Sequence, residues 1–149
     1  MSENQNKNLL LTQQEQENLN IVQKMFEVVE QGNIQEALIY FTDDVEARIS
    51  IPEEVPLGGT FHGPKGIQQF LEAHKKTLVD TEWLDEEHWE TVVQGERVVI
   101  IGRERAHIMP TGNMYESDFA LAVTFRNGKI SKLYSFVDSA VLVKAYRGK

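Results

Sequence analysis

The second half of the chain alternates between apolar and polar residues, and this pattern predicts antiparallel strands. From Tyr115 to Phe125 the large apolar side chains recur at every second position, a period that places them on one face of a strand. Asn127-Gly128 follows directly, and this dipeptide favours a tight hairpin turn because both residues tolerate positive φ. Strands are therefore predicted from about Arg97 to Met109, from Tyr115 to Phe125 and from Lys129 to Val137, with a turn at 110–113.

The first half of the chain carries helical patterns instead. Thr12 to Glu15 is a capping-box sequence, so a helix is predicted from Thr12 until Gly32 ends it. A second, short helix is predicted after Asn33, and a third begins at Pro64. The remaining predicted elements are strands at 45–51 and 83–93, a loop at 52–63 and a short helix or tail at 138–146. This order predicts an α+β fold with the helices packed on one face of a curved sheet.

Composition limits the classes of protein that the chain can belong to. It has 149 residues, 41% of them hydrophobic, which suits one domain at 12–149 after a flexible tail at 1–11. The net charge of -8 argues against nucleic acid or an anionic membrane as partner. The chain has no cysteine and no long apolar run, so we expect a cytoplasmic protein.

The element order and three short motifs resemble a known family. The motifs are the helix start Gly63-Pro64-Lys65-Gly66-Ile67, the turn Pro110-Thr111-Gly112 and the hairpin Asn127-Gly128-Lys129-Ile130. They resemble the SnoaL-like branch of the nuclear-transport-factor-2-like superfamily, over about 12–146. The resemblance implies a strongly curved antiparallel sheet wrapped around N-terminal helices, in a cone with a pocket. It implies no single activity, because this fold hosts cyclases, isomerases, hydrolases, small-molecule binders and dimerisation modules.

A polar cluster on the predicted strands is the candidate catalytic site. Assumed turn lengths place His107 opposite Glu116 and Arg105 opposite Asp118, on one face of the sheet. A histidine beside a carboxylate can act as a general base, and an arginine can hold an oxyanion. SnoaL-like cyclases use such a pair of a histidine and an acid, which the resemblance carries to His107 with Glu116 or Asp118. The same charges also fit a plain solvent-exposed sheet face.

If the polar face lines the cone, it grades into an apolar pocket. We expect that pocket to be lined by Phe26, Tyr40, Val99, Ile101, Ala120, Ala122, Leu133 and Ser135. The four histidines lack metal-ligand spacing, so neither a metal nor a cofactor is predicted. His62 and His74 are isolated and fit surface or capping roles.

The opposite face carries aromatic residues that a monomer would leave exposed. With Trp89, Phe119, Leu121, Tyr134 and Phe136 on the convex side, a homodimer through that face is predicted. Three functions stay open: a homodimer that binds a small hydrophobic ligand, a cofactor-free isomerase, cyclase or hydrolase, and a non-catalytic interaction module. All three depend on which face of the sheet lies inside the cone.

Overall fold

The structure is a computed structural model that describes residues 10–148. Residues 1–9, most of the predicted tail, lie outside the described residues, and Leu10 and Leu11 have no regular secondary structure. The elements in chain order are α2 (Gln13–Glu30), α3 (Ile34–Ala37), η1 (Leu38–Tyr40), β1 (Phe41–Ile49), β2 (Gly59–His62), α4 (Gly63–Thr77), β3 (Leu78–Leu84), η2 (Glu86–His88), β4 (Glu90–Gln94), β5 (Arg97–Ile108), β6 (Asn113–Arg126), β7 (Lys129–Val137) and α5 (Ser139–Arg147). No helix among these residues has the length and apolar character needed to cross a membrane.

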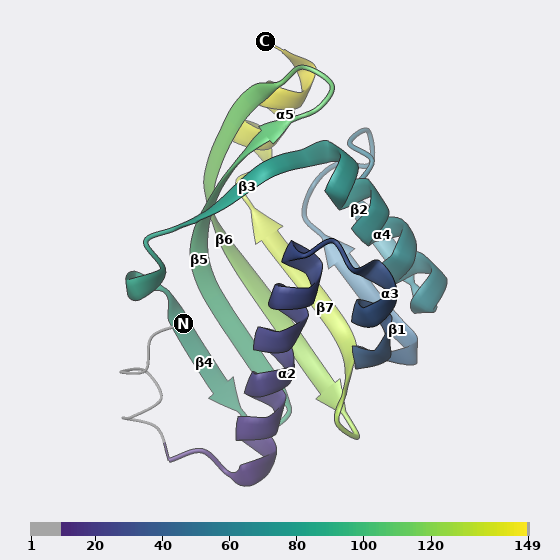
Figure 1. Cartoon of the computed structure of the whole chain (residues 1–149), viewed down its shortest axis with the longest axis vertical. Helices are drawn as coiled ribbons and strands as arrows, with labels where there is room; N and C mark the ends of the chain where they lie inside the picture. Colours follow the sequence, from purple (N-terminus) through teal and green to yellow (C-terminus); the bar gives the residue numbers. More distant parts are fainter. Residues whose placement is uncertain (1–9, 149) are drawn as a thin grey trace.

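Seven strands form one curved sheet, and three helices cover one face of it. The strand order is β2-β1-β7-β6-β5-β3, and β4 pairs with the other end of β5. Figure 1 shows α2, α3 and α4 in front of the sheet, while α5 lies at the end where β5 and β6 turn. This architecture confirms the predicted α+β fold with helices on a curved sheet.

Local signals account for the helix boundaries. The Thr12 hydroxyl accepts a hydrogen bond from the Glu15 amide at 3.1 Å, and the Glu15 carboxylate accepts one from the Thr12 amide at 2.9 Å. This reciprocal pair satisfies two amides that the first turn of α2 leaves free. Asn33 caps α3 in the same way, accepting from the Glu36 amide at 3.3 Å. The predicted starts of the first two helices are therefore confirmed, and α4 begins at Gly63, one residue before the predicted start at Pro64.

Three segments differ from the sequence prediction. The strand expected at 45–51 is β1, which begins four residues earlier, at Phe41, and ends at Ile49. The loop expected at 52–63 contains the short strand β2, which pairs with β1 because its extended backbone meets that strand's free edge. The single strand expected at 83–93 is two strands, β3 and β4, separated by η2. Asp85 adopts a left-handed conformation there, with φ 53°, and this turns the chain from one half of β5 to the other.

The sequence left open which face of the sheet lies inside the cone, and the structure places the aromatic face of β6 under the helices, so the orientation assumed for the predicted site and dimer does not hold. Phe119, Leu121 and Phe125 are buried, whereas Ala120 and Ala122 lie on the outer face of β6. Burying three large apolar side chains removes far more apolar surface from water than burying two alanines. The size of the apolar side chains on each face therefore decides which face meets the helices.

A bulge changes the side-chain orientation along β7. Phe125 pairs with Ile130, but Thr124 pairs with Lys132, so β7 carries one extra residue at this point. A one-residue shift moves every later side chain to the other face. Leu133 therefore points toward the helices, and Phe136 lies on the outer face, where it is 48% exposed.

Gly102 makes room for two aromatic rings over β5. A Cβ atom at this position would lie 2.7 Å from Cε2 of Trp89 and 2.8 Å from Cζ of Phe119. Because both rings are buried, we expect Gly102→Ala to lower the free energy of unfolding by about 1–3 kcal/mol through overpacking. Urea unfolding followed by tryptophan fluorescence measures this change. An unchanged midpoint would show that the two rings are free to shift.

Candidate functional site

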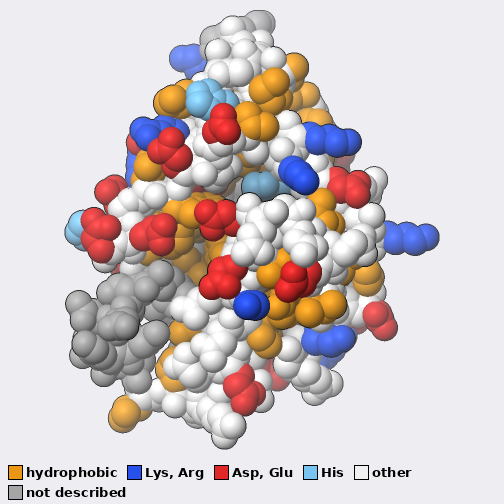
Figure 2. Space-filling model, viewed as in Figure 1, with side chains coloured by type: hydrophobic (Ala, Val, Ile, Leu, Met, Phe, Trp, Pro, Cys, Tyr) orange, Lys and Arg blue, Asp and Glu red, His pale blue; other side chains and the backbone are white. Residues whose placement is uncertain are grey.

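A cavity of about 550 Å³ lies between the concave face of the sheet and helices α2 and α4. In Figure 2, hydrophobic side chains are visible in a hollow on this side of the molecule, with acidic side chains around it. The volume suits a small organic molecule. The apolar lining consists of Met25, Phe26, Val29, Ile34, Phe41, Ile67, Phe70, Leu71, Leu78, Val79, Trp83, Phe119, Leu121 and Leu133.

Aromatic rings form one wall of the cavity. Trp83 meets Phe26 edge to face at a centroid distance of 5.7 Å and Phe119 at 5.9 Å. Behind them, Trp89 packs on Phe119 at 5.2 Å, and its indole N–H donates a hydrogen bond of 2.7 Å to the Leu84 carbonyl. Edge-to-face contacts of this kind favour one arrangement of the rings. These rings therefore form one apolar wall of the cavity with a defined arrangement.

Glu104 places a carboxyl group in this apolar cavity. It lies on the concave face of β5 and is 7% exposed, with Trp83 directly opposite on β3. Burial raises the pKa of Glu104 to about 7, although the hydrogen bond from Tyr115 works in the opposite direction. Both the acid and the carboxylate are therefore populated at neutral pH, which is the property of a proton-transfer group.

Tyr115 is the hydrogen-bond partner of Glu104 in the described part of the chain. Its hydroxyl donates to Glu104 Oε1 at 3.4 Å, and the whole side chain is buried. Burial, and then the charge of Glu104, raise the pKa of Tyr115, so the phenol stays protonated. A fixed phenol donor holds the carboxyl group in place without adding a charge.

His74 enters the same cavity from α4. Its ring meets Phe70 at a centroid distance of 5.9 Å, with the planes 68° apart. Burial lowers the pKa of His74 to about 4, so the imidazole is neutral at physiological pH. The surface and capping roles that the sequence suggested for this residue do not describe it, because it lines the cavity. Its place beside Ile67, Phe70 and Leu71 on one helical stripe was the signal for burial.

The family follows from a direct sequence match. The sequence model of the SnoaL-like domain family matches residues 22–133, which include most of the cavity-lining residues. The chain belongs to the SnoaL-like domain family. The resemblance drawn from the element order and turn motifs is therefore confirmed.

Solved structures of other proteins have the same fold. A nuclear-transport-factor-2-like protein from Burkholderia xenovorans is 27% identical, with a TM-score of 0.79 over 88% of this chain and 96% of that chain. TerC, co-crystallised with polyporic acid, is 24% identical, with a TM-score of 0.74 over 88% and 98%. A phenazine biosynthesis-related protein from Pseudomonas aeruginosa is 15% identical, with a TM-score of 0.71 over 90% and 83%. The comparison with curated proteins finds no match to this chain.

The four predicted catalytic residues of this SnoaL-like chain lie on the outer face of the sheet. Arg105 pairs with Glu82 at 2.6 Å, and Arg103 bridges Glu116 at 2.7 Å and Asp118 at 2.9 Å. His107 Nδ1 lies 4.0 Å from the nearest oxygen of Asp80, beyond hydrogen-bonding distance. Placing this cluster inside the cone was wrong, because the larger apolar side chains occupy that face.

The predicted register within the cluster also needs correction. Arg103 faces Asp118, Arg105 faces Glu116 and His107 faces Met114, because the turn spans 109–112 rather than 110–113. This moves each partner by two residues and keeps the face unchanged. The cavity lining contains none of the four predicted catalytic residues, which are His107, Asp118, Glu116 and Arg105. A catalytic role for them stays a prediction.

The predicted pocket residues are divided between the two faces of the SnoaL-like sheet. Phe26, Leu133 and Ser135 line the cavity, the last two because the bulge turns them inward. Tyr40, in η1, packs against the core but is absent from the cavity lining. The other four lie on the outer face, so placing them in the pocket was wrong: Val99, Ile101, Ala120 and Ala122.

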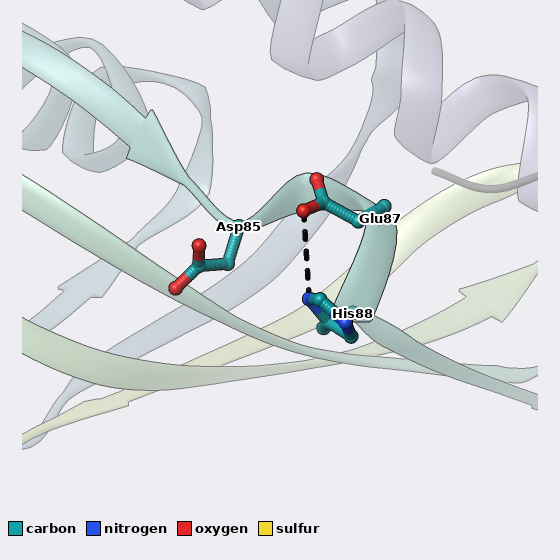
Figure 3. Close-up of side chains that lie close together, drawn as sticks. All are labelled: Asp85, Glu87 and His88. Carbon is teal, nitrogen blue, oxygen red and sulfur yellow. Dashed lines mark ion pairs between the residues drawn. The ribbon is translucent and has the colours of Figure 1, made fainter.

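One group of possible metal ligands is present among the described residues. Figure 3 shows Asp85, Glu87 and His88 at and just before η2. Their possible ligand atoms lie within 4.8 Å of one another. His88 Nδ1 lies 3.5 Å from Glu87 Oε1, and all three residues are exposed. Exposed charges at this spacing interact weakly, so we assign this group no role.

Proposed function

We propose that this SnoaL-like protein binds a small, apolar, ring-containing molecule in the cavity and transfers a proton on it with Glu104. The observation that carries the proposal is the buried carboxyl group, whose pKa of about 7 suits both proton uptake and release. The aromatic wall supports a ring-containing substrate. Two structural neighbours support an organic ligand in this fold: TerC, which was co-crystallised with polyporic acid, and the phenazine biosynthesis-related protein.

The reaction that fits a buried carboxyl group in an apolar surrounding is proton abstraction next to a carbonyl. The Glu104 carboxylate would take a proton from the α-carbon, and the electrons of the broken C–H bond would form an enolate. If the substrate has a C=C bond conjugated with the enolate, Glu104 would return the proton to the far carbon of that dienolate, which moves the double bond without any net change in oxidation state. Cyclisation follows instead if the enolate carbon attacks a second carbonyl of the same molecule, whose oxygen becomes an alkoxide and takes the proton from Glu104. These steps need the properties that burial confers on Glu104.

Deuterium exchange tests this proposal before the natural substrate is identified. Purified protein is incubated in D₂O with enolisable ring-containing ketones such as 2-tetralone, and proton NMR follows the loss of the α-proton signal. We expect exchange faster than in buffer alone for ketones that fit the cavity. A ligand that binds without faster exchange would favour the alternative function, a binding protein with no chemistry.

We also propose that two copies pair through the outer face of the sheet, with a patch that differs from the one the sequence suggested. Three apolar side chains are prominent there: Val92 is 55% exposed, Ile101 41% and Phe136 48%. Pairing across β5, β6 and β7 aligns Ile101, Ala120 and Phe136 in one row. A contiguous apolar row inside a charged border is typical of a surface that a partner covers.

Replacing Phe136 with aspartate tests this pairing. We expect multi-angle light scattering to give twice the chain mass of 17.1 kDa for the unmodified protein and a single chain mass for Phe136→Asp. Ile39→Asp is the matched control, because Ile39 is 61% exposed in η1, off the sheet. A single chain mass for the unmodified protein would contradict the proposed dimer.

A further inference from the structure

We infer that His74 binds the oxygen atom of the substrate as a hydrogen-bond donor, from the helix side of the cavity, while Glu104 acts from the sheet side. The inference rests on the proposed function and narrows its substrate class. The ligand would be an apolar ring system with a carbonyl oxygen that becomes an enolate, or a phenolic oxygen in its place.

The first step of the argument is that the imidazole of His74 has no hydrogen bond within the described residues. Its one recorded side-chain interaction there is the ring contact with Phe70, which uses no ring nitrogen for hydrogen bonding. The side chain is partly buried, and it lines the cavity. An imidazole that makes no hydrogen bond to the described residues is therefore available to a ligand in that cavity. A neutral imidazole offers one N–H donor and one acceptor nitrogen.

The second step concerns where His74 lies. It is on α4, whereas Glu104 is on β5, and both side chains line the same cavity. A ligand in that cavity has the carboxyl group on its sheet side and the imidazole on its helix side. The two polar groups can therefore act on different atoms of one molecule, with the apolar lining around its ring.

The third step is the charge of the imidazole. Burial keeps His74 neutral at physiological pH, so its N–H can stabilise a developing negative oxygen without placing a full positive charge in the cavity. A neutral imidazole is also a weak acid. It would therefore hold the enolate oxygen without protonating it and leave the proton to Glu104.

Two ring-containing probes separate this contact from general binding. 2-Naphthol has a phenolic oxygen in the place of the enolate oxygen, and naphthalene has the same rings without it. We expect the unmodified protein to bind 2-naphthol about tenfold or more tightly than naphthalene, which is the effect of one buried hydrogen bond. In His74→Phe, which keeps a ring of similar size, we expect the two affinities to become nearly equal. His74→Gln, which keeps a donor, should retain part of the preference.

The outcomes distinguish failure of this inference from failure of the proposed function. If neither probe binds the unmodified protein, the proposed small-molecule function is overturned as well. If both bind and His74→Phe keeps the full preference for 2-naphthol, His74 does not hold the oxygen, while the role of Glu104 stands. His62→Phe is the matched control, because His62 is an exposed histidine just before α4, and it should leave both affinities unchanged. Thermal unfolding of each variant checks that it is folded.

Discussion

Glu104→Gln is expected to abolish most of the deuterium exchange that the protein catalyses. The amide keeps the size of the side chain but cannot take up or release a proton near neutral pH. General acid–base groups typically contribute about 10²–10⁴-fold to a rate, so we expect a loss in that range. Exchange of the α-protons of 2-tetralone, measured at pH 7 with saturating ketone, gives this ratio directly.

Two control variants distinguish the cavity from the outer face. Glu116→Gln removes a carboxylate of similar chemistry that lies on the other side of the sheet, where it pairs with Arg103. His107→Gln removes the histidine that the sequence pattern first suggested as a base. We expect both to exchange deuterium at the rate of the unmodified protein. A normal rate for Glu104→Gln together with a lost rate for His107→Gln would move the chemistry to the outer face.

The second large expected effect is on the pH dependence of the free energy of unfolding, to which Glu104 and His74 contribute in opposite directions. The pKa of Glu104 is raised from 4.5 to about 7 by burial. The folded protein therefore binds more protons than the unfolded chain between these values, and its stability falls as the pH rises. The pKa of His74 is lowered from 6.5 to about 4 by burial. The unfolded chain then binds more protons in this range, and stability rises with pH.

In the unmodified protein these two contributions largely cancel between pH 4.5 and pH 6.5. Each amounts to on the order of 3 kcal/mol over its full range, by the usual conversion of a pKa shift into free energy. The other titratable groups that line the cavity are Glu30, Lys75 and Asp80, and Tyr115 contacts Glu104 from behind. They are present in every variant compared, so differences between variants isolate Glu104 and His74.

Urea unfolding at a series of pH values measures both contributions. Relative to the unmodified protein, Glu104→Gln should gain stability as the pH rises from about 4.5 to 7. His74→Phe should lose relative stability as the pH rises from about 4 to 6.5. The double variant should show neither trend. Parallel pH profiles for all four proteins would mean that neither group has a shifted pKa.

Elements fixed by local chemistry could be predicted from the sequence. The capping residues Thr12 and Asn33 and the turn Asn127-Gly128 act through hydrogen bonds and backbone preferences within a few residues. The hairpin at Asn127-Gly128 and the first three helices therefore lie close to where the pattern placed them, whereas the turn between β5 and β6 lies one residue earlier than predicted. The strand β2 was missed because its pairing with β1 is non-local, and the segment just before it contains Pro52, Pro56 and Gly58.

The pattern of charged residues did not identify which face of the sheet lies inside the cone. The predicted site was therefore placed on the wrong side of the sheet. Paired charges such as Arg103 with Asp118 occur on exposed sheets as well as in active sites. The size of the apolar residues on each face was the better signal. The same comparison singles out Glu104, because the inward positions of β5 are otherwise apolar or glycine. The bulge in β7 leaves no comparable mark in the sequence.

Carbon-13 NMR of the glutamate side-chain carboxyl groups is the most direct test of the buried acid at the base of the cavity. The resonance that disappears in Glu104→Gln identifies Glu104, and its chemical shift is followed from acid to alkaline pH. We expect a midpoint at about pH 7 for this resonance. A midpoint near 4.5 would show that Glu104 is an ordinary solvated carboxylate and would contradict its role in proton transfer.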